Sequence, residues 1–191
     1  MNRSHTTACF AARHGGPRHA QRGVTLVECV VTLAIIVITL GAAIPTFTQA
    51  RERRHLEGAA AQLATDLRHA RGLAVSHRAS VRFSVQQVAD GSCYVVHTGP
   101  AGDCQCTGAG SSSCRGNAQA LRTVGFERAG PVHLASNSAS MLFDADRGTV
   151  TPTGTLSLQL QGGATIRQIV NIMGRVRSCS PGAAAVGYVA C

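Results

Sequence analysis

The sequence predicts an α+β fold in which one long N-terminal helix packs on an antiparallel β-sheet. Two observations lead to this prediction. Residues 24 to about 76 keep a helical pattern, in which Pro45 is expected to kink the helix or mark its exit from the lipid. Beyond residue 80 only short strand-like segments follow, most of them separated by Gly or Pro. A single helix followed by strands alone is typical of a helix laid against an antiparallel sheet. The 191 residues leave room for one domain after the first half of the helix.

The first half of the predicted helix, residues 24–44, is almost entirely apolar. About 20 apolar residues in a helix can cross a bilayer, so we expect a transmembrane span here. Glu28 is the exception, and an ionisable group inside such a span indicates a function that offsets its cost. If the chain were cut after Gly23, the new amino group of Val24 would be a cation one helical turn from Glu28. It could neutralise the Glu28 of its own helix or that of a neighbouring copy.

The second half, residues 45–79, reads as an amphipathic helix. One face carries small or apolar residues, namely Leu56, Leu63, Leu67, Ala70 and Ala74. Charged residues fall mostly elsewhere on the helix, namely Arg51, Arg53, Arg54, Glu57, Asp66 and Arg68. We expect the apolar face to pack on the sheet and the charged residues to face solvent.

Residues 80–191 are predicted to form the β-sheet domain. Strands are expected at 81–85, 93–97, 121–126, 141–143, 155–161 and 165–172. Asp90 and Gly91 form a strong turn pair, which predicts a hairpin of the first two strands. Residues 98–118 are rich in Gly, Ser and Cys, so we expect a loop that disulfides hold rather than packing.

Six of the eight cysteines follow the apolar run, and an even set in an oxidising compartment predicts disulfides. Cys179 and Cys191 are the expected pair at the C-terminus, worth about 3 kcal/mol of stability. The remaining four are expected to pair among themselves in one of several ways; they are Cys93, Cys104, Cys106 and Cys114. The alternative is a zinc site formed by these four with His97. The irregular spacing and the loss of thiolates on oxidation favour disulfides, so we predict no metal and no cofactor.

The residues around the predicted cut resemble a known signal. Gly23 followed by an apolar residue, Thr25-Leu26 and a glutamate at position 28 is similar to the prepilin cleavage signal of type IV pilins and type II secretion pseudopilins. The resemblance implies that a prepilin peptidase removes residues 1–23 and N-methylates Val24, and that Glu28 helps to dock the subunit into a filament. The alternative is a secretory signal peptide cut near residues 42–44. Such a peptide would rarely contain Glu28.

Later segments resemble the GspH/FimT family of minor pilins, namely residues 66–75, 81–83, 143–148 and 174–177. The resemblance implies a type IV pilin-like fold and a single-pass protein of the inner membrane with its C-terminal domain in the periplasm. It would assemble with other pilins into a surface type IV pilus or a periplasmic pseudopilus. A FimT-like minor pilin and a GspH-type pseudopilin of the type II secretion system are the two functions left open.

The segment Gly174-Arg175-Val176-Arg177 is the main candidate binding site. Residues two apart on a strand share a face and lie about 6.6 Å apart, so Arg175 and Arg177 could contact successive phosphates of a nucleic acid strand. In the family that the chain resembles, a C-terminal Gly-Arg-x-Arg motif marks minor pilins that bind DNA in natural transformation. The resemblance thus implies DNA binding by Gly174, Arg175 and Arg177. The alternative is a solvated strand end.

The net charge alone does not decide whether the chain binds DNA. The formal charge is +9, but four arginines lie in the predicted leader, which leaves the mature chain near +5. No enzyme signature is present, and Asp144 and Asp146 are expected to be turn residues rather than a catalytic pair. We therefore predict a structural and interaction protein and not an enzyme. An alternative is a periplasmic enzyme or metal carrier with an uncleaved anchor, which should tolerate mutation of Glu28.

Overall fold

The computed structural model describes residues 23–191, except residues 109, 162 and 184. The predicted leader, apart from Gly23, lies outside the described residues. The chain divides into two compact units, Met1–Ala43 and Ile44–Cys191. Helix α1 (Leu26–His77) contributes to both units.

Within the first unit, α1 begins with a defined cap. The Glu28 amide donates a hydrogen bond of 3.2 Å to the Thr25 hydroxyl, which satisfies an amide that has no partner within the helix. The large apolar side chains that follow are exposed as far as Leu40. In the described part of the chain we found no helix long and apolar enough to cross a membrane. The span expected at residues 24–44 stays a prediction.

Within the second unit, α1 buries the face that the sequence predicts. Leu56, Leu63, Leu67, Ala70 and Ala74 are all buried, together with Ala60. The helix ends at His77, two residues before the expected boundary. It ends there because Arg78 adopts a left-handed conformation, with φ of 50°.

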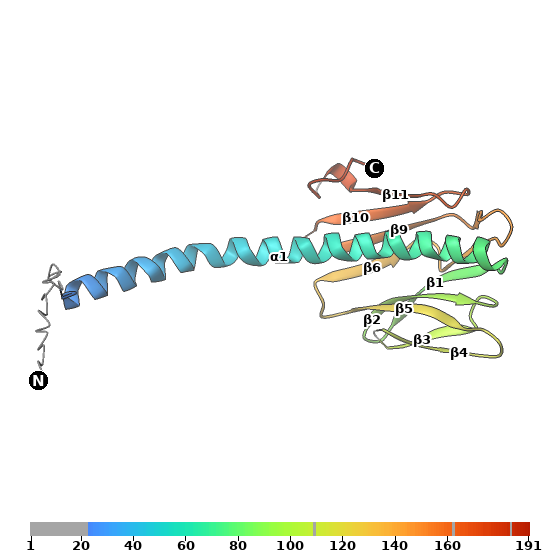
Figure 1. Ribbon diagram of the computed structural model, residues 1–191, viewed down its shortest axis with the longest axis horizontal. Helices are drawn as coiled ribbons and strands as arrows, with labels where there is room; N and C mark the ends of the chain where they lie inside the picture. The colour runs from blue at the N-terminus through green and yellow to red at the C-terminus, as the bar shows by residue number, and fades with distance from the viewer. Residues whose placement is uncertain (1–22, 109, 162, 184) are drawn as a thin grey trace, which may run out of the picture. The chain divides into compact units, whose positions relative to one another are not determined.

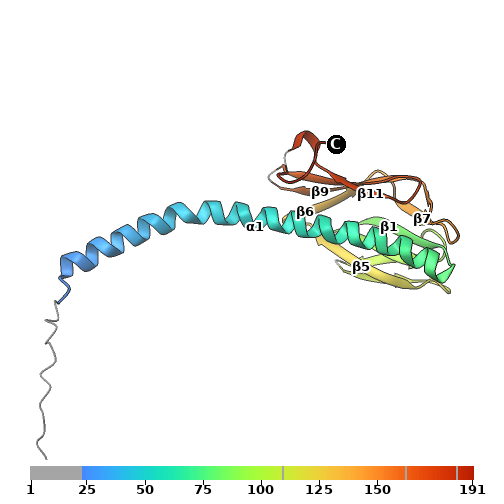
Figure 2. The ribbon, with the colours of Figure 1, turned by 45° about the horizontal axis from the view of Figure 1, so that its top comes forward.

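Two antiparallel sheets follow. The strands of the first are β1 (Val81–Val88), β2 (Gly91–Thr98), β5 (Ala120–Glu127), β7 (Ser140–Phe143) and β8 (Val150–Thr151), in the order β5-β2-β1-β7-β8. The strands of the second are β6 (Val132–Ser136), β9 (Gly154–Leu160), β10 (Thr165–Val170) and β11 (Val176–Cys179), in the order β11-β10-β9-β6. The C-terminal part of α1, which buries residues from Leu56 onward, runs along both sheets (Figure 1 and Figure 2). A short 3₁₀ helix, η1 (Pro181–Ala183), follows β11.

The region 98–118 is more ordered than a simple loop. It contains a two-stranded sheet of β3 (Cys104–Gly108) and β4 (Ser111–Cys114). Disulfides Cys93–Cys106 and Cys104–Cys114 attach this hairpin to β2 and close it. The expected disulfides are confirmed. The segment was expected to be a loop held by disulfides alone, but it forms a hairpin that also satisfies its own backbone hydrogen bonds.

The structure corrects several strand predictions. Strands β3, β4, β6 and β8 were not predicted. The strand expected to carry Arg175 and Arg177 is β11, but it begins at Val176, after Arg175, and β10 ends at Val170 rather than residue 172. The hairpin of β1 and β2 is confirmed, with Gly91 paired to Val88. The disulfide Cys179–Cys191 joins the end of β11 to the C-terminus, as expected.

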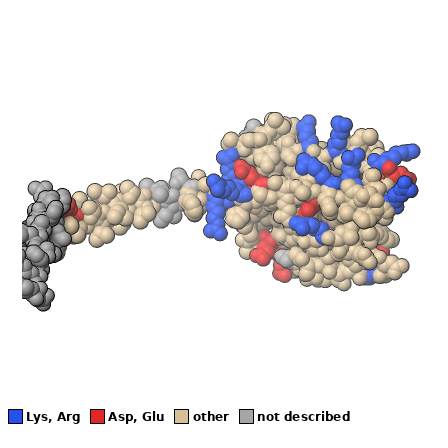
Figure 3. Space-filling view, viewed as in Figure 1, with Lys and Arg blue, Asp and Glu red and all other residues tan. Residues whose placement is uncertain are grey.

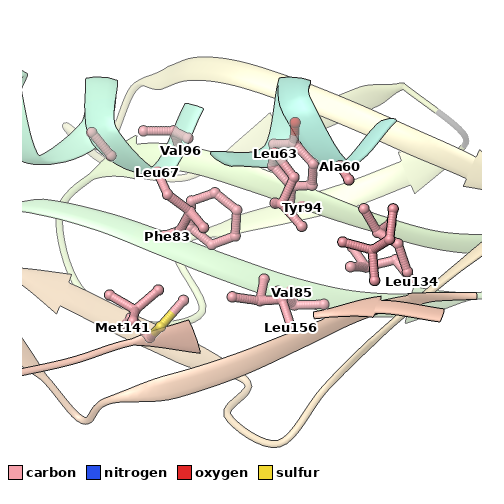
Figure 4. Packing of buried hydrophobic residues seen from close by; sticks show 14 of the residues in the cluster. Ala60, Leu63, Leu67, Phe83, Val85, Tyr94, Val96, Leu134, Met141 and Leu156 are labelled. Carbon is pink, nitrogen blue, oxygen red and sulfur yellow. The ribbon is translucent and has the colours of Figure 1, made fainter. Parts of the chain in front are cut away.

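One hydrophobic core joins α1 to both sheets. Figure 4 shows Phe83 and Tyr94 side by side, close to Leu63 and Leu67 of the helix. The two aromatic rings stack, with centroids 4.8 Å apart. From the second sheet, Gln168 donates a hydrogen bond of 3.1 Å to the Ala60 carbonyl of α1. The core therefore fixes the second half of α1 against both sheets.

Candidate functional site

The Gly-Arg-Val-Arg segment begins at a tight turn between β10 and β11. The Gly174 amide donates to the Asn171 carbonyl at 2.8 Å, and the Arg175 amide donates to the Asn171 side chain at 2.9 Å. The Val150 amide of β8 donates to the Ile172 carbonyl at 2.9 Å. The turn is thus held by its own bonds and by the neighbouring sheet.

Gly174 is required by packing inside the domain. Its φ is +71°, a conformation that favours glycine. A Cβ here would lie 2.5 Å from the Gly148 carbonyl oxygen and 2.7 Å from the Arg71 side chain. The sequence suggested that this glycine lets another backbone approach closely. The structure shows that the approaching groups belong to the same chain.

Arg71 links the helix to these glycines. Its Nε donates a hydrogen bond of 3.0 Å to the Gly148 carbonyl, and the side chain is half-buried. Gly148 also has positive φ, and a Cβ there would lie 2.9 Å from Val75. The two glycines therefore provide the space in which the Arg71 side chain lies.

The turn before Gly148 confirms the prediction for Asp144 and Asp146. The Asp144 carboxylate accepts hydrogen bonds from the amides of Arg147 at 2.9 Å and Asp146 at 3.1 Å. These two bonds lower the pKa of Asp144 below its ordinary value. The carboxylate is thus used in an Asx turn that presents the exposed Arg147.

These elements form an open groove of about 740 Å³. Four arginines line it: Arg68 and Arg71 from α1, Arg147 from the turn after β7, and Arg175 from the turn just before β11. The other lining residues are Gly72, Val75, Ser76, Gly174 and Val176. None of the described lining residues is acidic. Figure 3 shows basic side chains gathered on the side of the domain that carries β10 and β11. We call this surface the arginine groove.

Arg177 lies outside the lining of this groove. It stands on β11 opposite Ile169, while Arg167 stands opposite Cys179. Arg167 and Arg177 are therefore diagonal neighbours on one face of the second sheet, about 7 to 8 Å apart by ordinary strand geometry. Arg175 precedes the first residue of β11.

Three residues of the arginine groove were not predicted from the sequence, namely Arg68, Arg71 and Arg147. Arg147 lies far along the chain from the other two, and nothing in their spacing indicates that the fold brings them together.

The predicted filament residues lie in the first unit. Gly23, Val24 and Glu28 are all exposed. Within that unit they precede or occupy the first turn of α1. Their exposure is compatible with processing and with contacts to another subunit.

The zinc alternative does not fit the structure. All four cysteines of the candidate site are bonded in disulfides. His97 is fully buried, with its Nε2 2.9 Å from the Ser84 hydroxyl and its Nδ1 2.9 Å from the Thr98 carbonyl. Because a carbonyl oxygen only accepts hydrogen bonds, Nδ1 carries the proton.

Ser84 and His97 resemble the nucleophile and base of a catalytic site. Both are buried, so the Ser84 hydroxyl is closed to a substrate.

One polar network was not predicted. Asp66 is buried and accepts hydrogen bonds from the Tyr94 hydroxyl at 2.6 Å and from Arg122 Nε at 2.9 Å. Burial, followed by the contact with Asp66, raises the pKa of Tyr94, and the Asp66 carboxylate raises the pKa of Arg122. The expectation that Asp66 faces solvent was wrong, because its side chain pairs with the buried Tyr94 of β2 and the exposed Arg122 of β5.

Comparison with known protein families gives two matches. Residues 59–174 match the family described as type II transport protein GspH. Residues 18–44 match the prokaryotic N-terminal methylation motif. No curated protein matched the chain.

Similar solved structures include the type IV minor pilin FimU of Pseudomonas aeruginosa strain PAO1. It shares 22% identity over 65% of this chain and 96% of that chain, with a TM-score of 0.47. The minor pseudopilin EpsH from the type 2 secretion system of Vibrio cholerae shares 16% identity over 66% of this chain and 97% of that chain, with a TM-score of 0.45.

Proposed function

The chain belongs to the GspH family of minor pilins and pseudopilins, and we propose that it is a FimT-like minor pilin that joins a type IV pilus. The observation that carries this proposal is the methylation motif at residues 18–44, which covers the start of a capped helix with exposed apolar side chains. A GspH-type pseudopilin of a type II secretion system is the second candidate, because the matched family is described as a type II transport protein. The genes that flank this one distinguish the two.

The same segment, residues 18–44, is also the basis for the proposed proteolytic processing of the chain. A prepilin peptidase cuts between Gly23 and Val24 and methylates the new amino group of Val24. Residues 24–44 hold the subunit in the inner membrane before assembly, and the second unit lies in the periplasm. Its three disulfides support that location, since disulfides persist in oxidising compartments.

Glu28 docks the subunit into the filament by pairing with the N-terminal amine of a neighbouring pilin. A carboxylate in apolar surroundings is costly unless a cation compensates it. The test compares wild type with Glu28→Ala in the native host, and the readout is the amount of the subunit in sheared filaments. Loss of the variant from filaments, with unchanged processing, supports docking. Equal incorporation would contradict it.

DNA binding is the finer part of the proposal. Arg175 and Arg177 are exposed, and the arginine groove adds three further guanidinium groups beside Arg175. Such a surface contacts phosphates with little sequence preference, and its affinity falls with salt. One subunit binds weakly, so firm capture needs several subunits on one filament.

The test uses the full chain in detergent micelles and a labelled DNA duplex. Arg175→Gln together with Arg177→Gln should remove most of the binding. The control replaces two exposed arginines outside the groove, Arg115→Gln and Arg128→Gln, with the same loss of charge. Equal weakening by both pairs would show that net charge, rather than this site, carries the binding.

A further inference from the structure

The turn between β10 and β11 presents two large apolar side chains to solvent. Ile172 is 61% exposed and Met173 is 56% exposed. Most large apolar residues of the second unit belong to the core, although Val186 and Val189 are also exposed. The exposure of Ile172 and Met173 has a cost in water, and the position of this pair next to the arginine groove sets it apart.

The turn is rigid. Asn171 accepts hydrogen bonds from the backbone amides of both Gly174 and Arg175. The Ile172 carbonyl accepts a hydrogen bond from the Val150 amide. The two side chains are therefore held at a fixed tip, and their exposure is a built feature of the hairpin.

The tip adjoins the arginine groove. Gly174 and Arg175, which directly follow Met173, both line the groove, and Arg147 lies in the turn that leads to β8. An apolar tip beside four guanidinium groups suits a partner with anionic groups around an apolar interior. A DNA duplex has this chemistry, since phosphates flank stacked bases.

The size of the tip favours a duplex over a lipid surface. Interfacial membrane binding uses a broad apolar face, whereas two side chains match the wedges that minor-groove proteins insert between base steps. Ile and Met are among the residues used as such wedges. The minor groove is about 6 Å wide, so the two side chains at the tip enter it while the two-stranded hairpin stays outside.

We propose that Ile172 and Met173 insert between base pairs of a DNA duplex whose phosphates the arginine groove holds. This inference rests on the proposed DNA binding and goes beyond it. The wedge unstacks a base step and bends the duplex, and a distorted duplex then contacts more of the basic surface. Mismatched or flexible steps, which unstack easily, should bind better than stiff ones.

The first experiment uses the full chain in detergent micelles with a duplex that carries 2-aminopurine and a donor and acceptor dye at its ends. Wild type should raise the 2-aminopurine fluorescence and change the energy transfer. Ile172→Ser with Met173→Ser should remove both signals and weaken duplex binding by about tenfold, with the salt dependence unchanged. The matched control is Val186→Ser with Val189→Ser, an equally exposed apolar pair elsewhere, and it should behave as wild type.

The outcomes separate the two proposals. No duplex binding by wild type would overturn the DNA-binding function. Binding without unstacking, or equal unstacking by the serine variant, would overturn the wedge alone.

A second experiment tests the lipid alternative. The chain contains no Trp, so Met173→Trp provides a single reporter in nanodiscs of neutral or anionic lipid, with Val189→Trp as control. Quenching of the Met173→Trp variant by duplex supports base stacking. A blue shift with anionic lipid, together with no response to duplex, would contradict the wedge and assign the tip to the membrane.

Discussion

The Tyr94 hydroxyl donates a 2.6 Å hydrogen bond to the Asp66 carboxylate inside the domain. Arg122 adds an ion pair of 2.9 Å to the same carboxylate oxygen. Because Asp66 lies on α1, Tyr94 on β2 and Arg122 on β5, one carboxylate joins the helix to two neighbouring strands. This polar link complements the apolar core and fixes how the helix sits on the first sheet.

Removing the carboxylate should be costly. Asp66→Ala leaves the buried Tyr94 hydroxyl without an acceptor, and we expect a loss of about 2 to 3 kcal/mol in the free energy of unfolding. The control is Glu57→Ala, which breaks an exposed ion pair with Arg53 and should cost less than about 1 kcal/mol. Denaturant unfolding monitors both variants, and equal costs would contradict the buried network.

Stability should also fall at high pH. Burial and Asp66 raise the pKa of Tyr94 above its ordinary value of 10.0. Tyr94 therefore keeps its proton in the folded protein at a pH where the unfolded chain releases it. Its stabilising contribution is complete below pH 10 and decreases above that pH, by up to about 1.4 kcal/mol per pH unit. Tyr94→Phe should lose stability less steeply between pH 10 and 11 in thermal unfolding. An identical slope would rule this contribution out.

Gly174→Ala should disturb both stability and binding. The added Cβ meets the Gly148 carbonyl and Arg71, so we expect a loss of about 2 to 3 kcal/mol and weaker DNA binding. The control is Gly116→Ala, where φ is similar, at +61°, and no atom lies within 4 Å of the new Cβ. It should cost about 1 kcal/mol, which is the cost of placing alanine in a left-handed backbone conformation without any clash. If both variants lose the same free energy of unfolding, the clash predicted for the added Cβ at position 174 does not occur.

The arginine groove should contribute to DNA binding beyond the Gly-Arg-Val-Arg segment. Arg68→Gln with Arg147→Gln removes two phosphate contacts, and the slope of log affinity against log salt should decrease by about 2. Titrations of a duplex at several salt concentrations measure this slope. An unchanged slope would restrict the binding site to β11 and its neighbours.

The C-terminal disulfide should stabilise the second unit. Cys179→Ser with Cys191→Ser should lower the free energy of unfolding by about 3 kcal/mol, because the unfolded chain regains the freedom of the open loop. Cys29 is exposed and not disulfide-bonded, so Cys29→Ser should leave unfolding unchanged. A stable double variant would show that the bond adds little beyond packing.

Periodicity predicted most of the fold. The buried face of α1 was readable because Leu56, Leu63 and Leu67 recur at helical spacing. Asp66 was placed wrongly, since one charged residue beside that face gives no sign of partners far along the chain. Strands β8 and β11 are short, and β6 offers one short alternation, so none gave a clear pattern.

The candidate site was predicted only in part. Arg175 and Arg177 were visible as a motif, but the groove combines residues of α1, the turn after β7 and β11. Only the tertiary fold brings these segments together. Gly174 was singled out because it lets another backbone approach closely, but the groups that lie close to it are Gly148 and Arg71 of the same chain.

The central claim is that this chain becomes a filament subunit through processing at Gly23. Intact-mass and N-terminal peptide mass spectrometry of the protein from its native host tests the claim directly, with a strain that lacks the prepilin peptidase as control. We predict a mature chain that begins with N-methylated Val24 in the wild-type strain, and the unprocessed chain in the control. An N-terminus at Met1 in both strains, or a cut beyond Ala43, would contradict the account.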